Sequence, residues 1–275
     1  MRGPALLART LSVPTRRGVG SRAWQYHSRS DHHSKLACWA VMFDLLLECD
    51  AVRDAAARGR LGFGVNHTMV GPINKTLDLV LTVVQPNRTG RGRRSFAAVA
   101  GALGIVLDDE DRKALRSLPE LFEEAAEDVS EVAVALEAKA CMTEHVKSLP
   151  RLHAEILATG YLAKKAAPHC IAVSYSLVNA APDFVTPSGA GKRNLHHQPE
   201  DARRVVEMIA RAIPTANDVQ AYGYDVIGVT VLECRNDGSR VRVLNKSPAP
   251  TTCDHVHYER MIRSLCSSFR SRFRL

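Results

Sequence analysis

The sequence predicts an α/β fold. Its 275 residues are 45% hydrophobic and 24% charged, which is ordinary for a globular protein with a sizeable core. Apolar runs of strand length alternate with longer segments of helical character, in the order helix, strand, strand, strand, helix, strand. The segments expected to form this order are 36–58, 61–70, 75–84, 131–141, 148–165 and 169–181.

The first helix and the two strands after it are separated by clear stop signals. The helix 36–58 is rich in Ala and Leu, contains no Pro or Gly, and ends before Gly59. The strand 61–70 alternates weakly between apolar and polar residues. A turn at 71–74, containing Gly and Pro, leads into the strand 75–84.

An insertion, 87–130, separates the second strand from the third. It begins with a basic loop and is expected to contain two helices, near 95–104 and 109–128. The helix after the third strand is expected to start near Ser148, which is a good N-cap. Pro150 would then lie in the first turn, where a proline is tolerated.

The segment beyond the fourth strand is expected to elaborate this core. Asn236-Asp237-Gly238 marks a hairpin, since Asp-Gly is a preferred turn pair. The elements expected here are a helix at 199–213, hairpin arms at 222–234 and 240–246, and a helix from about Asp254. The chain thus divides into an N-terminal segment, 1–35, a core, 36–181, and a C-terminal elaboration, 182–275, for which DNA recognition or dimerisation is expected.

Basic residues outnumber acidic ones, 37 to 29, giving a formal net charge of +8. This balance favours a polyanionic partner, with nucleic acid as the leading candidate and an anionic membrane surface as the weaker one. Residues 1–30 contain six arginines and no acid, so residues 1–35 are expected to form a flexible basic arm. An Arg-rich, acid-free segment is also typical of an organellar transit peptide, which is the alternative.

The seven cysteines indicate a reducing compartment. They are odd in number, dispersed and include no C-x-x-C pair, a pattern that predicts no disulfide framework. No apolar stretch approaches the roughly 20 residues that span a bilayer. We therefore expect a cytoplasmic protein with no membrane partner.

Charged residues interrupt two of the apolar strands. Asp78 lies within the apolar run 77–84, and Glu137-Ala-Lys139 ends the run that starts at Val132. Alternate strand residues point to the same face, roughly 7 Å apart, so Glu137 and Lys139 emerge together. Buried strands seldom carry charges unless these are paired or bind metal. The pattern predicts a divalent-metal site with a positioned lysine, as in phosphodiester hydrolases; a structural ion pair is the alternative.

The triplet Asp111-Arg-Lys113 has the same spacing in a different context. It lies among other charged residues, in a stretch typical of the first turn of a solvated helix. Glu137 and Lys139 instead follow five apolar residues. The context therefore favours the triplet at 137–139 as the functional one.

The element order, with an acid in the second strand and E-x-K at the end of the third, resembles the PD-(D/E)xK nuclease superfamily. The resemblance covers about residues 36–181 and implies a restriction-endonuclease-like αβββαβ core, with a mixed sheet flanked by helices. The family's motif often has Pro before the first acid, where this chain has Leu77. The helical insertion 87–130 must then loop out of the core and return.

The resemblance also implies roles for individual residues. Asp78 and Glu137 would bind Mg²⁺ through carboxylate oxygens, with Mn²⁺ as a substitute, and Lys139 would orient the attacking water. Many relatives carry a further acid on the first helix. Glu48 is the candidate for that metal ligand, with Asp44, one turn earlier, as its substitute.

Three groups of side chains are candidate DNA contacts. One group follows the third strand and should lie near the scissile phosphate, and the other two belong to basic loops elsewhere. Phosphate contacts from such side chains position a duplex without reading its sequence. The candidates are Thr143, His145, Lys147, Arg91, Arg93, Arg94, Lys192 and Arg193.

Taken together, these features predict a Mg²⁺-dependent DNA endonuclease similar to type II restriction enzymes. Such an enzyme is expected to act as a homodimer, because cutting both strands calls for two active sites. A phage or repair exonuclease of the same superfamily is one alternative. A non-catalytic basic DNA-binding protein, in which Glu137 and Lys139 merely pair, is the other.

Overall fold

The computed structural model describes residues 1–16, 23–70, 73–84, 94–124, 129, 131–187, 191–212 and 223–275. Its helices are α1 (Gly3–Leu11), α2 (His32–Glu48), α3 (Asp50–Ala57), α4 (Phe96–Ala102), α5 (Asp109–Ser117), α6 (His145–Ala166), α7 (Glu200–Arg211) and α8 (Tyr258–Arg272). Its strands are β1 (Thr15–Arg16), β2 (Ala23–Trp24), β3 (Leu61–Met69), β4 (Lys75–Val83), β5 (Glu131–Cys141), β6 (Ile171–Asn179), β7 (Asp183–Val185), β8 (Arg193–Leu195), β9 (Val226–Glu233) and β10 (Arg242–Val243).

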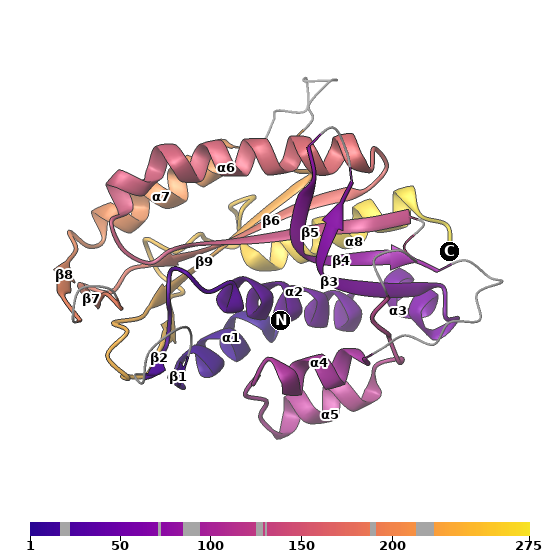
Figure 1. Ribbon diagram of the computed structural model, residues 1–275, viewed down its shortest axis with the longest axis horizontal. Coiled ribbons are helices and arrows are strands. Elements are labelled where there is room, and N and C mark those ends of the chain that lie inside the picture. Colours follow the sequence, from indigo (N-terminus) through magenta and orange to yellow (C-terminus); the bar gives the residue numbers. More distant parts are fainter. Residues whose placement is uncertain are drawn as a thin grey trace.

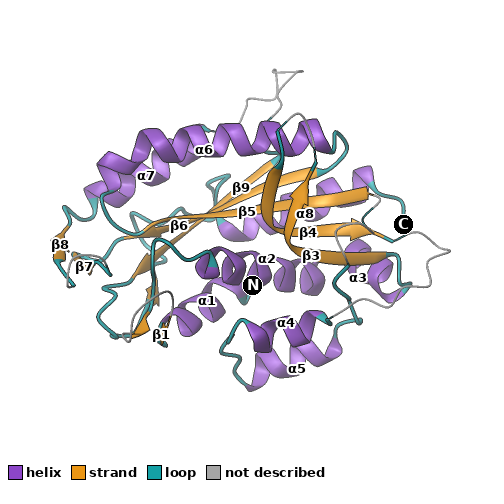
Figure 2. Ribbon diagram, viewed as in Figure 1, coloured by secondary structure: helices purple, strands orange, loops and turns teal. Residues whose placement is uncertain are grey.

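A mixed sheet of six strands runs through the described part of the chain, in the order β10-β9-β6-β5-β4-β3. Its strands lie between layers of helices (Figure 2). β3, β4 and β5 form an antiparallel meander, and β6 and β9 continue the sheet parallel to β5. Parallel neighbours need a crossover connection, which α6 supplies between β5 and β6 and α7 between β6 and β9. The carboxyl ends of β5, β6 and β9 therefore all lie at the same end of the sheet.

Helices cover both faces of this sheet (Figure 1). One hydrophobic core joins the sheet to α1, α2, α3 and α8, and a second core joins its other face to α6 and α7. The expectation of an α/β fold is therefore confirmed. The predicted order of helix, three strands, helix and strand is also found, as α2, β3, β4, β5, α6 and β6.

Helix boundaries differ from the predicted ones in several places, of which three are informative. The first helix breaks at Cys49, whose φ of −112° and ψ of 101° are extended, so α2 and α3 are separate. α5 ends at Ser117 instead of 128, two residues before Pro119, which disfavours helical backbone at its predecessor. α6 starts at His145, and Pro150 lies in its second turn. A proline there removes only one main-chain hydrogen bond near the helix end.

The expectation of a flexible N-terminal arm is wrong for residues 1–16. α1 packs against α2, and Leu6, Leu7 and Leu11 are buried in the core. Its arginines pair within the molecule: Arg2 contacts Asp111, and Arg9 contacts Asp108 and Asp111. Two of the six arginines in residues 1–30 are thus paired with acids about a hundred residues away, at the start of α5.

The expectation of no disulfide is also wrong. Cys49, between α2 and α3, is bonded to Cys266 on α8, and their Cα atoms are 5.4 Å apart. The bond fixes the C-terminal helix to the core. β9 likewise pairs with β6, so the segment after residue 182 completes the same sheet. Among the described residues, no helix is both long and apolar enough to cross a membrane.

Candidate active site

Asp78 and Glu137 lie on neighbouring antiparallel strands, one step beyond the paired residues Leu79 and Leu136. Leu77 and Leu79 pack into the two different cores although they are two residues apart. The backbone of β4 therefore rotates at Asp78. This rotation turns the Asp78 carboxylate toward the first turn of α2 and toward the main chain of β5.

Two hydrogen bonds hold the Asp78 carboxylate. Oδ1 accepts from the Ser34 hydroxyl, 2.7 Å away, and Oδ2 accepts from the main-chain N–H of Ala138, 3.0 Å away. Burial, followed by the negative charge of Glu137, raises the pKa of Asp78 from 3.8 to about 6. The two carboxylates are thus close enough to interact electrostatically.

Glu137 is 4% exposed and is flanked by two lysines. Its Oε1 accepts hydrogen bonds from Lys139 Nζ at 2.7 Å and from Lys75 Nζ at 3.0 Å. Lys139 Nζ also lies 3.7 Å from Glu155 Oε2 on α6. Burial would lower the pKa of Lys139, but the Glu137 carboxylate outweighs this effect and the pKa is raised.

The structure therefore brings Asp78, Glu137 and Lys139 together, as predicted. Asp78 and Glu137 are the carboxylates that could hold a divalent cation. Among the described residues, no group of three or more His, Cys, Asp or Glu side chains is placed to hold a metal ion. Magnesium commonly needs only one or two protein carboxylates, because waters and substrate phosphates complete its octahedron.

Glu48 does not join this cluster. It is exposed at the last residue of α2, whereas Ser34, which contacts Asp78, is in the first turn. The fourteen-residue separation along the helix corresponds to roughly 21 Å. Asp44 is also directed elsewhere: its carboxylate accepts hydrogen bonds from the main-chain N–H groups of Arg2 and Gly3, at the start of α1. The acid expected from the first helix is therefore absent from this site.

Most of the described candidate DNA contacts have partners within the protein. His145 is 2% exposed, and its Nε2 lies 2.7 Å from the carbonyl oxygen of Asn179, so its prediction as a surface contact is wrong. The helix starts at His145 rather than after it, and this start places the imidazole in the interior.

The other described candidates lie at or near the surface. Lys192 is exposed, whereas the other four pair within the protein. Arg91 and Arg93 lie outside the described residues. The pairs are Thr143 with His196, Lys147 with Glu144, Arg193 with Asp183 and Arg94 with Glu123.

The sequence interpretation missed three residues at the site: Ser34, Lys75 and Glu155. Lys75 begins the strand that carries Asp78, so its position three residues before the acid was the available signal. Ser34 and Glu155 reach the site only through the packing of α2 and α6 on the sheet. No local sequence pattern distinguishes them from other helix residues.

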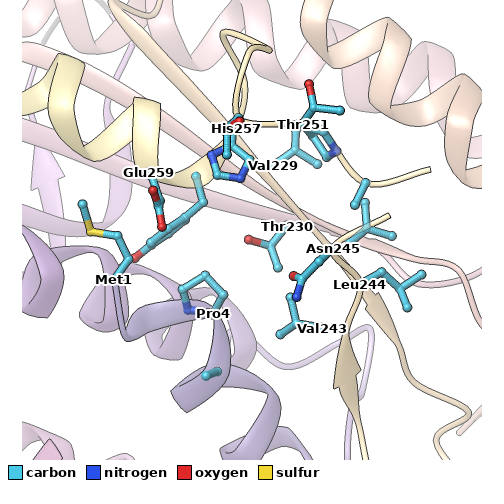
Figure 3. Close-up of a pocket in the computed structure, with 16 residues that line it drawn as sticks. Met1, Pro4, Val229, Thr230, Val243, Leu244, Asn245, Thr251, His257 and Glu259 are labelled. Atoms are coloured by element: carbon cyan, nitrogen blue, oxygen red, sulfur yellow. The ribbon is translucent and has the colours of Figure 1, made fainter. Parts of the chain in front are cut away.

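A cavity of about 440 Å³ lies at a different place, between β9, the segment that follows β10, and the starts of α1 and α8 (Figure 3). Its lining includes Thr230, Asn245, His257 and Glu259. Glu259 is the one carboxylate among its described lining residues. This cavity therefore lacks the pair of acids and the lysine found at the ends of β4 and β5.

Comparison with known proteins adds no family assignment. No family model, curated protein or solved structure matches this chain. The functional argument therefore rests on the site itself.

Proposed function

We propose that this protein is a divalent-metal-dependent DNA endonuclease. The observation that carries the proposal is the hydrogen bond from Ala138 N–H to the Asp78 carboxylate. It fixes one acid beside the strand segment whose flanking side chains are Glu137 and Lys139. Two acids and a lysine held by adjacent strands are the groups that a metal-assisted phosphodiester hydrolase needs.

The arrangement of the core supports the same proposal. An antiparallel meander, a crossover helix and a parallel fourth strand follow α2, with an acid in the second strand and E-x-K near the end of the third. This is the order that the resemblance to PD-(D/E)xK nucleases implies. We include in the proposal a restriction-endonuclease-like core spanning α2 to β6.

The charges at the site fit one hard cation. The pKa of Asp78 is raised to about 6 by burial and by Glu137, so a cation between the two carboxylates would relieve their repulsion. We propose Mg²⁺, with Mn²⁺ as a substitute. When bound, such an ion polarises the phosphate and lowers the pKa of a coordinated water.

The side chains of the site then have distinct tasks. Asp78 and Glu137 would hold the cation. Lys139, 2.7 Å from Glu137, orients the attacking water and stabilises the negative charge that develops on the phosphate. Lys75 contacts the same oxygen of Glu137 and keeps this buried carboxylate paired in the absence of the cation.

The proposed substrate is double-stranded DNA, supported by the net charge of +8. Cleavage of both strands calls for two active sites, so a homodimer is part of the proposal. An exonuclease with the same core remains the second enzymatic possibility, and its products would differ. The test below separates these modes.

The test is incubation of the purified protein with supercoiled plasmid and Mg²⁺, with EDTA as the metal-free arm. Discrete fragments that disappear in EDTA are the expected result. A smear of products in Mg²⁺ would indicate a nonspecific endonuclease instead. Degradation of the linearised plasmid, with the closed circle left intact because it has no ends, would indicate an exonuclease. Binding without cleavage of either the closed or the linearised plasmid, with several plasmid sequences and with Mn²⁺ as well as Mg²⁺, would contradict the proposal and favour a DNA-binding protein.

A further inference from the structure

A second cavity, of about 550 Å³, lies where β9 ends and the chain turns toward β10. Three arginines line it, together with Ser239 and the loop that follows β6. The full lining is Ala181, Pro182, Glu233, Arg235, Asp237, Ser239, Arg240 and Arg242. We infer that this cavity, the arginine cavity, anchors a backbone phosphate of duplex DNA away from the scissile bond. The inference rests on the proposed function.

The arginines of this cavity are only weakly engaged by the protein. Arg242 lies 3.3 Å from Glu233, and Arg235 lies 3.7 Å from Asp183; the two arginine side chains are 71% and 47% exposed. Among the described residues, Arg240 has no hydrogen-bond or ion-pair partner. Exposed ion pairs of this kind contribute about 1 kcal/mol or less. A phosphate can therefore replace the carboxylates, and its oxygens suit the bidentate geometry of arginine.

The backbone that carries these arginines is held firmly in place. Asn236 is 2% exposed and has a positive φ of 59°. Its side chain accepts hydrogen bonds from the N–H groups of Gln25 and Tyr26 and donates to the carbonyls of Tyr26 and Val185. The turn is thus tied to two segments that are distant in the sequence.

Gln25 reinforces the same turn. Its side-chain oxygen accepts from Gly238 N–H, and its amide donates to the Ser239 carbonyl. Local turn chemistry alone does not require a buried asparagine or these distant partners. Because the arginine-bearing backbone is already fixed, little conformational entropy is lost when a ligand binds.

The arginine cavity and the candidate active site both lie toward the carboxyl ends of the parallel strands. Lys139 pairs in register with Ser176 on β6, which pairs with Val229 on β9. Glu233 is four residues further along β9, and Ala181 is five residues beyond Ser176. At about 3.3 Å per residue and 4.8 Å per strand, the two sites are roughly 15–20 Å apart. This span corresponds to about five base-pair steps, so a single duplex could contact both sites.

The test measures binding separately from cleavage. Affinity for a fluorescent 20-base-pair duplex is measured by anisotropy in EDTA over a series of NaCl concentrations, for the wild type, Arg240→Ala and Arg240→Ala/Arg242→Ala. Each lost phosphate contact is expected to reduce the slope of log affinity against log salt by about 0.9. Arg263→Ala, on the exposed surface of α8 and paired with Glu259, is the matched control and is expected to leave the slope unchanged.

Unchanged slopes in both arginine variants would overturn the inference, even if the plasmid assay shows cleavage. A reduced slope in the variants would support it independently of any cleavage. Inorganic phosphate provides a second arm: if it stabilises the wild type but not Arg240→Ala against thermal unfolding while the DNA slopes stay the same, the cavity binds free phosphate and the inference for DNA fails. Circular dichroism confirms that each variant is folded.

Discussion

The Asp78 carboxylate accepts a hydrogen bond from the main-chain N–H of Ala138, 3.0 Å away. This bond joins β4 to β5 at the residue that separates Glu137 from Lys139. Ala138 itself points into the core on the α2 side and is 4% exposed. The acid is therefore positioned relative to the other two side chains by the main chain of the sheet, which is more rigid than a loop.

The first prediction concerns the pH dependence of stability in EDTA. Burial and the charge of Glu137 raise the pKa of Asp78 from 3.8 to about 6. Between pH 3.8 and about pH 6, the native state therefore binds more protons than the unfolded chain. As the pH rises through this range, the ionised Asp78 increasingly destabilises the fold. We expect the free energy of unfolding of Asp78→Asn, measured relative to the wild type, to be about 2–3 kcal/mol higher at pH 7 than at pH 4.

Urea unfolding of both proteins at the two pH values measures this difference. A gap between wild type and Asp78→Asn that is the same at pH 4 and pH 7 would show that Asp78 titrates normally. Glu48→Gln, which removes one exposed carboxylate at the end of α2, serves as the control for the loss of a negative charge as such.

The second prediction concerns the acids of α2 and β5. We expect Glu137→Gln to lower the cleavage rate by about 10²–10³-fold or more, whereas Glu48→Gln should leave it unchanged because Glu48 lies far from Asp78. Single-turnover cleavage in Mg²⁺ measures both. A comparable loss in the two variants would mean that Glu48 reaches the metal, contrary to the position of this residue at the end of α2.

The third prediction concerns Asp44, whose carboxylate accepts hydrogen bonds from Arg2 and Gly3 at the start of α1. Asp44→Ala leaves these buried N–H groups without a partner. We expect the free energy of unfolding to fall by about 2 kcal/mol. An unfolding curve that overlays the wild type would indicate that α1 does not depend on this contact.

The fourth prediction concerns the bond between Cys49 and Cys266, which closes a loop with a sequence separation of 217. Constraint of the unfolded chain by such a loop gives up to about 5 kcal/mol in the chain-entropy model. We expect Cys49→Ser/Cys266→Ser to unfold at a lower urea concentration than the wild type. Dithiothreitol is expected to lower the urea midpoint of the wild type but not that of the variant. Seven titratable thiols in the denatured, unreduced wild type would contradict the bond.

The fifth prediction concerns Lys75, which shares Glu137 Oε1 with Lys139. A cation must compete with this ammonium for the carboxylate. Lys75→Ala is therefore expected to lower the Mg²⁺ concentration for half-maximal cleavage by roughly three- to tenfold, an effect of about 1 kcal/mol. A higher Mg²⁺ requirement in the variant would instead show that Lys75 assists the bound state.

The central strands were predictable because their signal is local. β5 runs from Glu131 to Cys141, as the apolar run predicts, and it carries Glu137 and Lys139 at the expected end. The second triplet, Asp111-Arg-Lys113, could also be distinguished from it by context. Asp111 forms a capping box at the start of α5 and pairs with Arg2 and Arg9. Apolar context placed Glu137 and Lys139 in the sheet and Asp111 at the start of a helix without any knowledge of packing.

What the sequence could not provide depends on distant contacts. The arginines of α1 looked like a solvated arm because their acidic partners lie on α5. The connection of Cys49 to Cys266 depends on the packing of α8 against α2 and α3. Glu48 looked suitable because it lies among apolar residues, but the direction of α2 across the sheet brings Ser34 to Asp78 and carries Glu48 away. Such directions are set by tertiary packing.

Comparison of Lys139→Ala with Lys113→Ala tests the central claim most directly. The two lysines end triplets of the same spacing, but Lys113 is exposed on α5 and Lys139 contacts Glu137. In single-turnover plasmid cleavage with Mg²⁺, we expect Lys113→Ala to match the wild type and Lys139→Ala to lose at least about 10²-fold in rate. Equal rates for the two variants, with metal-dependent cleavage intact, would contradict the assignment of the active site to Asp78, Glu137 and Lys139.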